Sequence, residues 1–279
     1  MNNLLLKEKL TQFLKEDLNF GDFSTCYLPT QNVSGYFIAK QAGIICGQAI
    51  PQCAYDLLGT AQYTPLVSDG TWVAAGTKIG QVTGESTTIL SAERVILNLM
   101  QHLSAIATKT KTAVDLLANP NIKITDTRKT TPGLRLFEKY AITCGGGCNH
   151  RYDLSGGVML KDNHLAACQQ DLAQAVALIR QHHGPLTAIE VEIETKQQLL
   201  AAIALPINTL MFDNQNPTTI NEWAQLVPKH IQIEASGGID LSNLAQFAQC
   251  KIDYLSLGCL TNNVANLDIS FLLVDAIKS

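Results

Sequence analysis

Hydrophobic and polar positions in the second half of the chain follow a repeating pattern. Short runs rich in β-branched residues are followed by stretches with a helical period, which is typical of βαβ units around a parallel sheet. The runs predict strands at residues 122–126, 157–160, 188–193, 209–212, 231–235 and 254–257. Helices are predicted at 197–204, 218–226 and 241–248, and a seventh strand near 142–144.

Polar residues at the ends of these strands favour one of two parallel folds. Periodicity alone fits either a βα barrel or an open doubly wound sheet. A barrel brings the C-terminal ends of all its strands to one mouth, where active sites of that architecture form. Residues at or just past such ends are Arg128, Lys161, Glu192 or Glu194, Asp213, Ser236 and Gly258. We therefore predict a barrel with a site at its mouth.

The first part of the chain lacks this βα pattern. Residues 1–14 predict an amphipathic helix, residues 33–46 and 72–82 predict strands, and 93–117 predict a long helix with a broad apolar face. The predicted domains are an N-terminal α+β sandwich over residues 1–117 and the βα barrel over 118–267. We expect the C-terminal segment, 268–279, to pack on the first domain.

Composition and charge narrow the choice of partners. The 279 residues are 46% hydrophobic and 16% charged, with a formal net charge of -4, which argues against binding nucleic acid or an acidic membrane without sequence preference. No apolar run reaches the roughly 18 residues of a membrane span, and the N-terminus is unlike a targeting peptide. We expect a cytoplasmic enzyme. Its eight cysteines should be reduced, and Cys144, Cys148 and His150 lack the usual spacing of a zinc site.

Carboxylates alternate along one predicted strand. Glu190, Glu192 and Glu194 share one face because strand side chains alternate every two residues. One interpretation is an edge strand whose carboxylates contact water. The other is that they face the barrel interior and meet lysines or a metal ion. Asp213 ends the next strand, and two carboxylates at neighbouring strand ends suit Mg²⁺. Glu192 and Asp213 are therefore predicted to bind magnesium together with a phosphate substrate.

Glycines and cations complete a predicted site for a polyanionic small molecule. Ser236, Gly237 and Gly238 stand between a strand and a helix start, and Gly258 follows the next strand. Glycines there allow close backbone approach, and free N–H groups favour a phosphate. The cations are Arg128, Lys129, His150, Arg151 and Lys161. Arg128 and Arg151 are candidates for binding carboxylates, since guanidinium forms paired hydrogen bonds with them.

Taken together, these motifs resemble a known family. They lie at residues 92–98, 102–108, 127–133, 138–141, 145–147, 150–151, 161–164, 190–192, 213–214 and 234–239. In order and approximate spacing they are similar to the quinolinate phosphoribosyltransferases, also called nicotinate-nucleotide pyrophosphorylases. The chain departs from that pattern at residues 260–263, where many relatives have Thr-His-Ser, and at Gly156 and Gly157, which are smaller than the usual pair.

The resemblance implies an incomplete, seven-stranded βα barrel and a homodimer, with higher oligomers also open. The implied reaction transfers phosphoribosyl from phosphoribosyl pyrophosphate to quinolinate with decarboxylation, giving nicotinate mononucleotide, pyrophosphate and CO₂ in de novo NAD biosynthesis. Arg94 would reach the partner's site. By the same resemblance, quinolinate contacts Arg94, Arg128, His150 and Arg151. The catalytic set would be Lys129, Lys161, Glu192 and Asp213, with Mg²⁺ as cofactor, and the 5-phosphate would bind at Ser236, Gly237, Gly238 and Gly258.

Three other functions remain open at this point. The nearest is a phosphoribosyltransferase that acts on another aromatic acid. A more distant one is a barrel lyase in which Lys161 forms a Schiff base, which requires burial to lower its pKa. The third is a protein that binds a phosphorylated metabolite without turnover.

Overall fold

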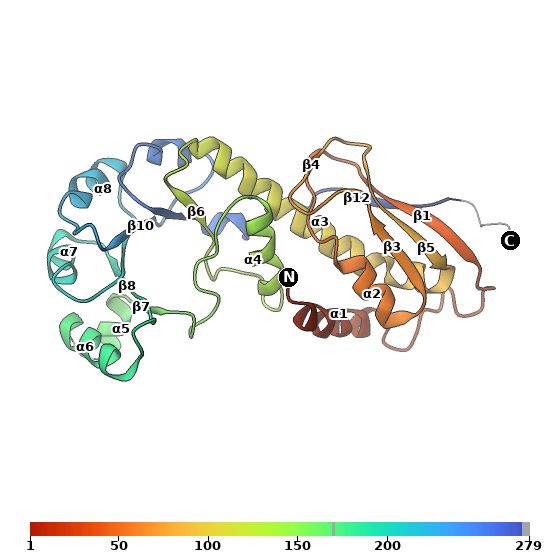
Figure 1. Cartoon of the computed structure of the whole chain (residues 1–279), viewed down its shortest axis with the longest axis horizontal. Coiled ribbons are helices and arrows are strands. Elements are labelled where there is room, and N and C mark those ends of the chain that lie inside the picture. The colour runs from red at the N-terminus through yellow and green to blue at the C-terminus, as the bar shows by residue number, and fades with distance from the viewer. Residues whose placement is uncertain (169–170, 275–279) are drawn as a thin grey trace. The chain divides into compact units, whose positions relative to one another are not determined.

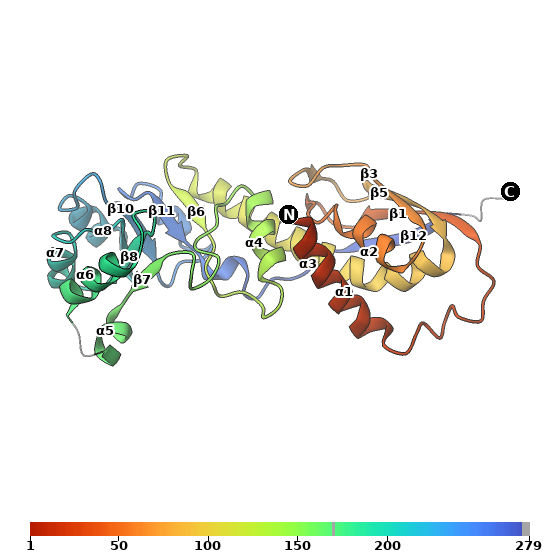
Figure 2. The same cartoon turned by 60° about the horizontal axis from the view of Figure 1, so that its bottom comes forward.

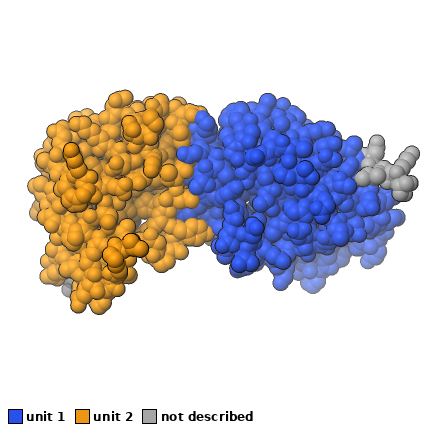
Figure 3. Space-filling view, viewed as in Figure 1, with its two compact units in different colours: residues 1–111, 133–146, 263–279 blue, residues 112–132, 147–262 orange. Residues whose placement is uncertain are grey.

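A computed structural model describes residues 1–168 and 171–274. The chain divides into two compact units (Figure 3). The first comprises residues 1–111, 133–146 and 263–279, and the second comprises residues 112–132 and 147–262. Within the described residues, no helix combines the length and the apolar character needed to cross a membrane.

The first unit contains an antiparallel sheet of strands β12, β1, β5 and β3 in that order (Figure 1). Their bounds are Ile269–Val274, Asn32–Ala39, Lys78–Glu85 and Ala61–Pro65. Alternate residues of β1 are buried, as expected for a sheet with one covered face. The ring of Phe37 packs against Tyr63 and Phe271, with centroids 5.8 and 5.0 Å away. Residues 275–279, the rest of the predicted C-terminal segment, lie outside the described residues.

Helices pack beside this sheet. They are α1 (Asn3–Leu18), α2 (Ile50–Leu58) and α3 (Ser86–Leu117), and a small sheet pairs β2 (Gly43–Ile44) with β4 (Trp72–Val73). Helix α1 buries Leu6, Leu10 and Leu14, which confirms the predicted apolar face. Helix α2 packs against α1 and β3. Ser104 of α3 accepts a hydrogen bond from the Cys46 backbone N–H at 3.0 Å, and this bond satisfies a buried donor beside β2.

Residues 142–144, predicted as a strand, belong instead to helix α4 (Arg135–Cys144) of the first unit. The prediction was wrong because the local Ile-Thr-Cys sequence has β-branched side chains, whereas the wider spacing is helical. Phe137, Ala141 and Ile142 are buried on one face of the helix. Phe137 also packs against Phe13 of α1, with ring centroids 5.8 Å apart.

The second unit is built on a six-stranded parallel sheet in the order β6, β11, β10, β9, β8, β7. The strands are Lys123–Thr125 (β6), Val158–Leu160 (β7), Ile189–Ile193 (β8), Thr209–Asp213 (β9), Gln232–Ser236 (β10) and Tyr254–Ser256 (β11). All six predicted strands are therefore confirmed. Strand β8 lies between β9 and β7, so the interpretation of its carboxylates as belonging to an edge strand is wrong.

Helices α5 (Asp162–Cys168), α6 (Leu172–His182), α7 (Lys196–Ala202) and α8 (Pro217–Ala224) connect these strands. Helices α6, α7 and α8 lie along the same side of β8 and β10 (Figures 1 and 2). Thr195 and Gln198 form a capping box at the start of α7. The helix predicted at 241–248 is wrong in type, because only a 3₁₀ turn forms, at Leu244–Phe247. A second such turn spans Gly258–Leu260.

One residue extends the sheet beyond β6. Cys148 forms an isolated parallel bridge with Thr125. The Cys148 backbone N–H donates to the Ile124 carbonyl at 2.8 Å, and the Asp126 N–H donates to the Cys148 carbonyl at 3.2 Å. This bridge holds the segment that leads to His150 and Arg151 next to the C-terminal end of β6.

Candidate active site

A cavity of about 410 Å³ lies in the second unit at the C-terminal ends of its strands. The parallel order explains its position, since these ends meet on one side of the sheet. The predicted residues that line it are Arg128, Lys129, His150, Arg151, Lys161, Glu192, Asp213 and Ser236. The structure therefore places most of the predicted site residues around one cavity.

Among the described residues, four cations line the cavity. Arg128 and Lys129 follow β6, Lys161 follows β7, and Arg151 follows the Cys148 bridge. Burial lowers the pKa of the Arg151 guanidinium, and the nearby Arg128 lowers it further. The Arg151 Nη1 atom donates to the Gly157 carbonyl at 2.8 Å, which fixes the direction of the side chain. These charges repel one another, so a bound polyanion would stabilise the arrangement.

The backbone around Lys129 is fixed by its neighbours. Its N–H donates to the Thr127 hydroxyl at 3.0 Å, and its carbonyl accepts from the buried Thr261 hydroxyl at 2.7 Å. A side chain at Gly258 would place its Cβ 3.0 Å from the Lys129 Cδ atom. Gly258 does not line the cavity itself, but its lack of a side chain leaves room for Lys129 to reach it.

Two carboxylates of the described chain line the same cavity. Glu192 and Asp213 line the cavity, and with Glu194 they place one ligand oxygen each within 4.8 Å of one another. Burial raises the pKa of Glu192, and Asp213 raises it further, whereas Lys161 opposes the shift. A divalent cation would relieve this repulsion. The oxygen donors fit Mg²⁺, which commonly takes one or two carboxylates and completes its shell with water and phosphate oxygens.

The loop after β10, residues 236–238, has at its two glycines the positive φ angles that favour this residue. Gly237 and Gly238 have φ angles of 89° and 62°, which L side chains rarely adopt. A Cβ at Gly237 would lie 2.3 Å from Asn214 Oδ1, and Asn243 Nδ2 donates to the Gly238 carbonyl at 2.9 Å. The two glycines lie beyond the residues that line the cavity, and Ser236 is the member of this loop that lines it.

Arg94 lies exposed on α3 in the first unit. The residues that line the cavity belong to the second unit, so Arg94 is not among them; of the other predicted substrate-binding residues, Gly237, Gly238 and Gly258 do not line it either.

The cavity also has lining residues that sequence reasoning missed. They are Thr127, Leu154, Met159, His164, Met211 and Ser256. A signal for three of them was present, because Met159, Met211 and Ser256 stand two positions before Lys161, Asp213 and Gly258 and therefore share a strand face with them. Thr127 and His164 lie within motifs already recognised. No pattern in the sequence singled out Leu154.

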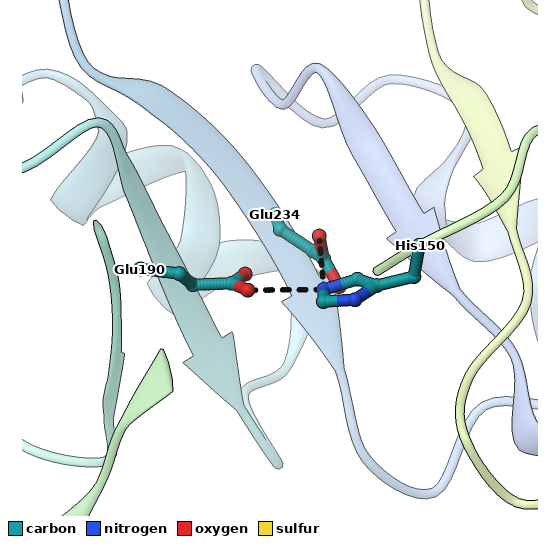
Figure 4. Close-up of side chains that lie close together, drawn as sticks. All are labelled: His150, Glu190 and Glu234. Carbon is teal, nitrogen blue, oxygen red and sulfur yellow. Dashed lines mark hydrogen bonds and ion pairs between the residues drawn. The ribbon is translucent and has the colours of Figure 1, made fainter. Parts of the chain in front are cut away.

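Two further acidic residues meet His150 (Figure 4). The Nε2 atom of His150 lies 3.0 Å from Glu190 Oε2 and 3.6 Å from Glu234 Oε2. Glu190 and Glu234 are both buried. Burial raises the pKa of Glu234 to about 7, with a further contribution from Glu190, while His150 and the Ser256 hydroxyl oppose the shift. Glu190 belongs to the alternating carboxylates already named from the sequence. Glu234 was not singled out, although it stands two positions before Ser236 and therefore shares a strand face with it.

Comparison with known proteins identifies the family. The model of the quinolinate phosphoribosyl transferase N-terminal domain matches residues 22–104, and that of the C-terminal domain matches residues 106–272. A probable nicotinate-nucleotide pyrophosphorylase (carboxylating) of Bacillus subtilis is 46% identical over 272 residues, or 97% of this chain and 94% of that protein. The chain belongs to the quinolinate phosphoribosyltransferase family.

More distant members of the quinolinate phosphoribosyltransferase family agree in length and fold. The nicotinate-nucleotide pyrophosphorylase (carboxylating) of Rattus norvegicus is 36% identical over 94% of this chain and 88% of its own. The crystal structure of NadC from Streptococcus pyogenes superposes with a TM-score of 0.92 at 35% identity, over 99% of each chain. The likeness therefore covers both units.

Proposed function

We propose that this chain is a phosphoribosyltransferase of de novo NAD biosynthesis. It transfers the phosphoribosyl group of phosphoribosyl pyrophosphate to quinolinate and releases pyrophosphate and CO₂, leaving nicotinate mononucleotide. The observation that carries the proposal is that two arginines and two lysines line the same cavity as Glu192 and Asp213. Such a cavity suits two anionic substrates, and relatives that share 35–46% of their sequence with the chain carry names for this activity.

We further propose that the parallel sheet is an incomplete, seven-stranded barrel and that the first unit is an α+β sandwich domain. The parallel bridge at Cys148 supports this, because it places a seventh segment beside β6. In a barrel the side chains at alternate positions of each strand face the interior. This accounts for the buried carboxylates of Glu190 and Glu234, which otherwise would be costly in a covered sheet.

Quinolinate would bind with its two carboxylates between Arg128 and Arg151, close to His150. Paired hydrogen bonds from guanidinium groups fix the plane of a carboxylate, which lysine cannot do. Lys129 and Lys161 would lie between the acid and the phosphoribosyl donor. Arg94 of the partner subunit would complete the site in a homodimer, and its exposed position on α3 leaves it accessible for that contact.

The donor would bind on the acidic side of the cavity. Glu192 and Asp213 would hold the ribose hydroxyls or Mg²⁺, and the loop from Ser236 to Gly238, with Gly258, would receive the 5-phosphate. Magnesium, when bound, would neutralise charge on the pyrophosphate group. Gly237 and Gly238 have no side chains and allow close backbone approach beside the end of β10, which supports a phosphate there.

The reaction follows from this placement of charge. The C1–O bond to pyrophosphate breaks and leaves an oxocarbenium-like ribose, which the carboxylate of Glu192 can stabilise. The quinolinate ring nitrogen supplies the electron pair for the new N–C1 bond. The positive ring then accepts the electrons of the adjacent C–COO⁻ bond as CO₂ leaves, and a proton replaces the carboxyl group on the carbon. Arg128, Arg151 and Lys161 hold the reactants against their mutual repulsion.

The deciding assay supplies quinolinate, phosphoribosyl pyrophosphate and Mg²⁺ and measures CO₂ and nicotinate mononucleotide together. Both products should form in equal amounts, and nicotinate in place of quinolinate should be a poor substrate. Turnover of nicotinate or another aromatic acid in preference to quinolinate would reject the proposed substrate. Binding of both substrates without pyrophosphate release would show a protein that does not catalyse the reaction.

The shared site of the proposed homodimer has its own test. Arg94→Ala and Lys161→Ala variants, each inactive alone, are mixed, dissociated and reassociated. A dimer with one subunit of each kind then contains one site with both native residues, so about a quarter of wild-type activity should return. Recovery of no activity, with exchange of subunits verified by mass, would contradict a shared site.

A further inference from the structure

A second cavity, of about 350 Å³, lies on the other side of His150 from the substrate cavity. Glu190 and Glu234 line this second cavity and do not line the first, whereas His150 and Arg151 line both. The two carboxylates therefore approach the imidazole from the side that a substrate would not occupy. They meet the substrate cavity through residues that line it: His150 for both carboxylates, and Ser256 for Glu234.

Both ring nitrogens of His150 have defined partners. Nδ1 accepts a hydrogen bond from the Arg151 backbone N–H at 2.8 Å, so Nδ1 carries its lone pair. The ring proton then lies on Nε2, which points at Glu190 Oε2 (Figure 4). The backbone N–H of His150 donates to the buried Asp126 carboxylate at 2.8 Å. Both the ring and the backbone of His150 thus hold the segment that carries Arg151.

The carboxylates are themselves fixed. The Ser256 hydroxyl donates to Glu234 and lies 2.5 Å from the Thr125 hydroxyl, so hydrogen bonds link β6, β11 and β10, and Glu234 on β10 lies 3.6 Å from His150 Nε2. The Oε1 atom of Glu190 is buried without a hydrogen-bond partner among the described residues, while its Oε2 atom lies 3.0 Å from His150 Nε2 and the same carboxyl adds to the raised pKa of Glu234. The raised pKa of Glu234 agrees with two carboxylates packed around one imidazole.

We propose that Glu190 and Glu234 are positioning residues that act through His150. They keep the ring proton on Nε2, so that Nδ1 binds the Arg151 backbone and the Arg151 guanidinium is held where a substrate carboxylate binds. The inference rests on the proposed function only for the identity of that substrate. A carboxylate that orients histidine through one nitrogen while the other nitrogen makes the functional contact is a known arrangement at metal sites, and here the contact is a backbone N–H.

Nitrogen NMR of the imidazole rings tests the tautomer in the wild-type protein, with the His150→Asn spectrum used to assign the signal. The Nε2–H form is expected for His150. A ring protonated on Nδ1 alone would overturn the inference. This measurement needs no substrate, so it decides the tautomer even if the chain proves to act on another acid.

Steady-state kinetics of Glu190 variants test the effect on the substrate. Glu190→Ala should raise the KM for quinolinate about tenfold or more, as loss of a hydrogen bond to a charged group typically does, with kcat changed much less. Glu190→Gln keeps an oxygen acceptor for Nε2–H and should restore KM to within about threefold, by the same reasoning. A KM unchanged in Glu190→Ala, or a loss confined to kcat, would contradict a positioning role. Glu222→Ala, on an exposed ion pair, serves as the control.

A double-mutant cycle separates action through His150 from general destabilisation. Asparagine at position 150 can place its Oδ1 atom near the former Nδ1 and accept the Arg151 N–H, but it has no Nε2. Adding Glu190→Ala to His150→Asn should therefore leave the KM for quinolinate within about twofold of the His150→Asn value. If instead the fold increases in KM of the two single variants multiply in the double variant, Glu190 acts on the site independently of His150. If the wild type has no activity with quinolinate, the proposed function fails, and the NMR result alone decides the positioning.

Discussion

The buried carboxyl of Glu234 should make the stability of the protein depend on pH in a predictable way. Its pKa is raised from an ordinary value of 4.5 to about 7, first by burial and then by Glu190. Each pKa unit corresponds to about 1.4 kcal/mol, so ionised Glu234 costs the folded state about 3 kcal/mol relative to the protonated form. Glu234→Gln removes this cost, because a neutral amide resembles the protonated acid in shape and hydrogen bonding.

The direction of this pH dependence follows from how strongly the folded and the unfolded protein bind the Glu234 proton. Below pH 4.5 both states hold the proton. Between pH 4.5 and about 7 the folded state keeps it while the unfolded state releases it, so the free energy of unfolding falls as pH rises. Above about pH 7 neither state holds the proton and the loss is complete. The difference in unfolding free energy between Glu234→Gln and the wild type should therefore grow by about 2 to 3 kcal/mol from pH 5 to pH 8.

Urea unfolding at a series of pH values measures this difference, and comparison of variant with wild type cancels the other titrating groups. The matched control is Glu222→Gln, which removes an exposed carboxylate 3.0 Å from Lys196 and should change stability by no more than about 1 kcal/mol. A difference for Glu234→Gln that stays constant across this range, or that shrinks as pH rises, would refute the raised pKa.

Three further predictions concern the substrate cavity. Arg128→Ala should lower kcat/KM for quinolinate by about 10² or more, because preorganised charge is lost; near-normal steady-state kinetics of the folded variant would contradict its role. Gly237→Ala should lower stability by about 1 to 3 kcal/mol and weaken donor binding, because its φ is 89° and a Cβ would meet Asn214. Thermal unfolding should show little change in Gly184→Ala, where a Cβ meets no atom within 4 Å. Removing divalent cations with a chelator should abolish turnover until Mg²⁺ is restored, and Glu192→Gln should need more Mg²⁺ for half-maximal rate; full activity in chelator would exclude the proposed metal.

The parallel strands could be predicted from sequence because a strand buried on both faces is a short continuous run of apolar residues. Strands β8, β9 and β10 are nearly continuous runs of buried residues, bounded by turn residues. The antiparallel strand β12 could not be predicted in this way, since its position in the sheet depends on pairing with β1 near the other end of the chain. The segment at 241–248 was predicted as a helix because Leu244 and Phe247 are buried three residues apart, a spacing that a 3₁₀ turn also provides.

The part of the candidate site that lies at the ends of strands could be predicted from the sequence. Lys161, Asp213 and Ser236 follow buried runs, and the parallel order brings them together. Glu190 was recognised as one of the alternating carboxylates of its strand, whereas Glu234 was missed because it was considered only as part of a strand. Glu234 carries a charge at a buried position, and its partner His150 comes from a loop that no periodicity places. A search for charged residues two positions before each strand end would have found Glu234.

The first unit takes its last strand from the end of the chain, and this has a consequence for synthesis. Strand β12 pairs with β1 along residues 34–39, so β1 has an open edge until residues 269–274 leave the ribosome. Unpaired edges of this kind promote association between chains. A nascent or prematurely ended polypeptide would expose this edge for as long as the last strand is missing, so chaperone demand and loss by aggregation should concentrate on products that stop short of Ile269.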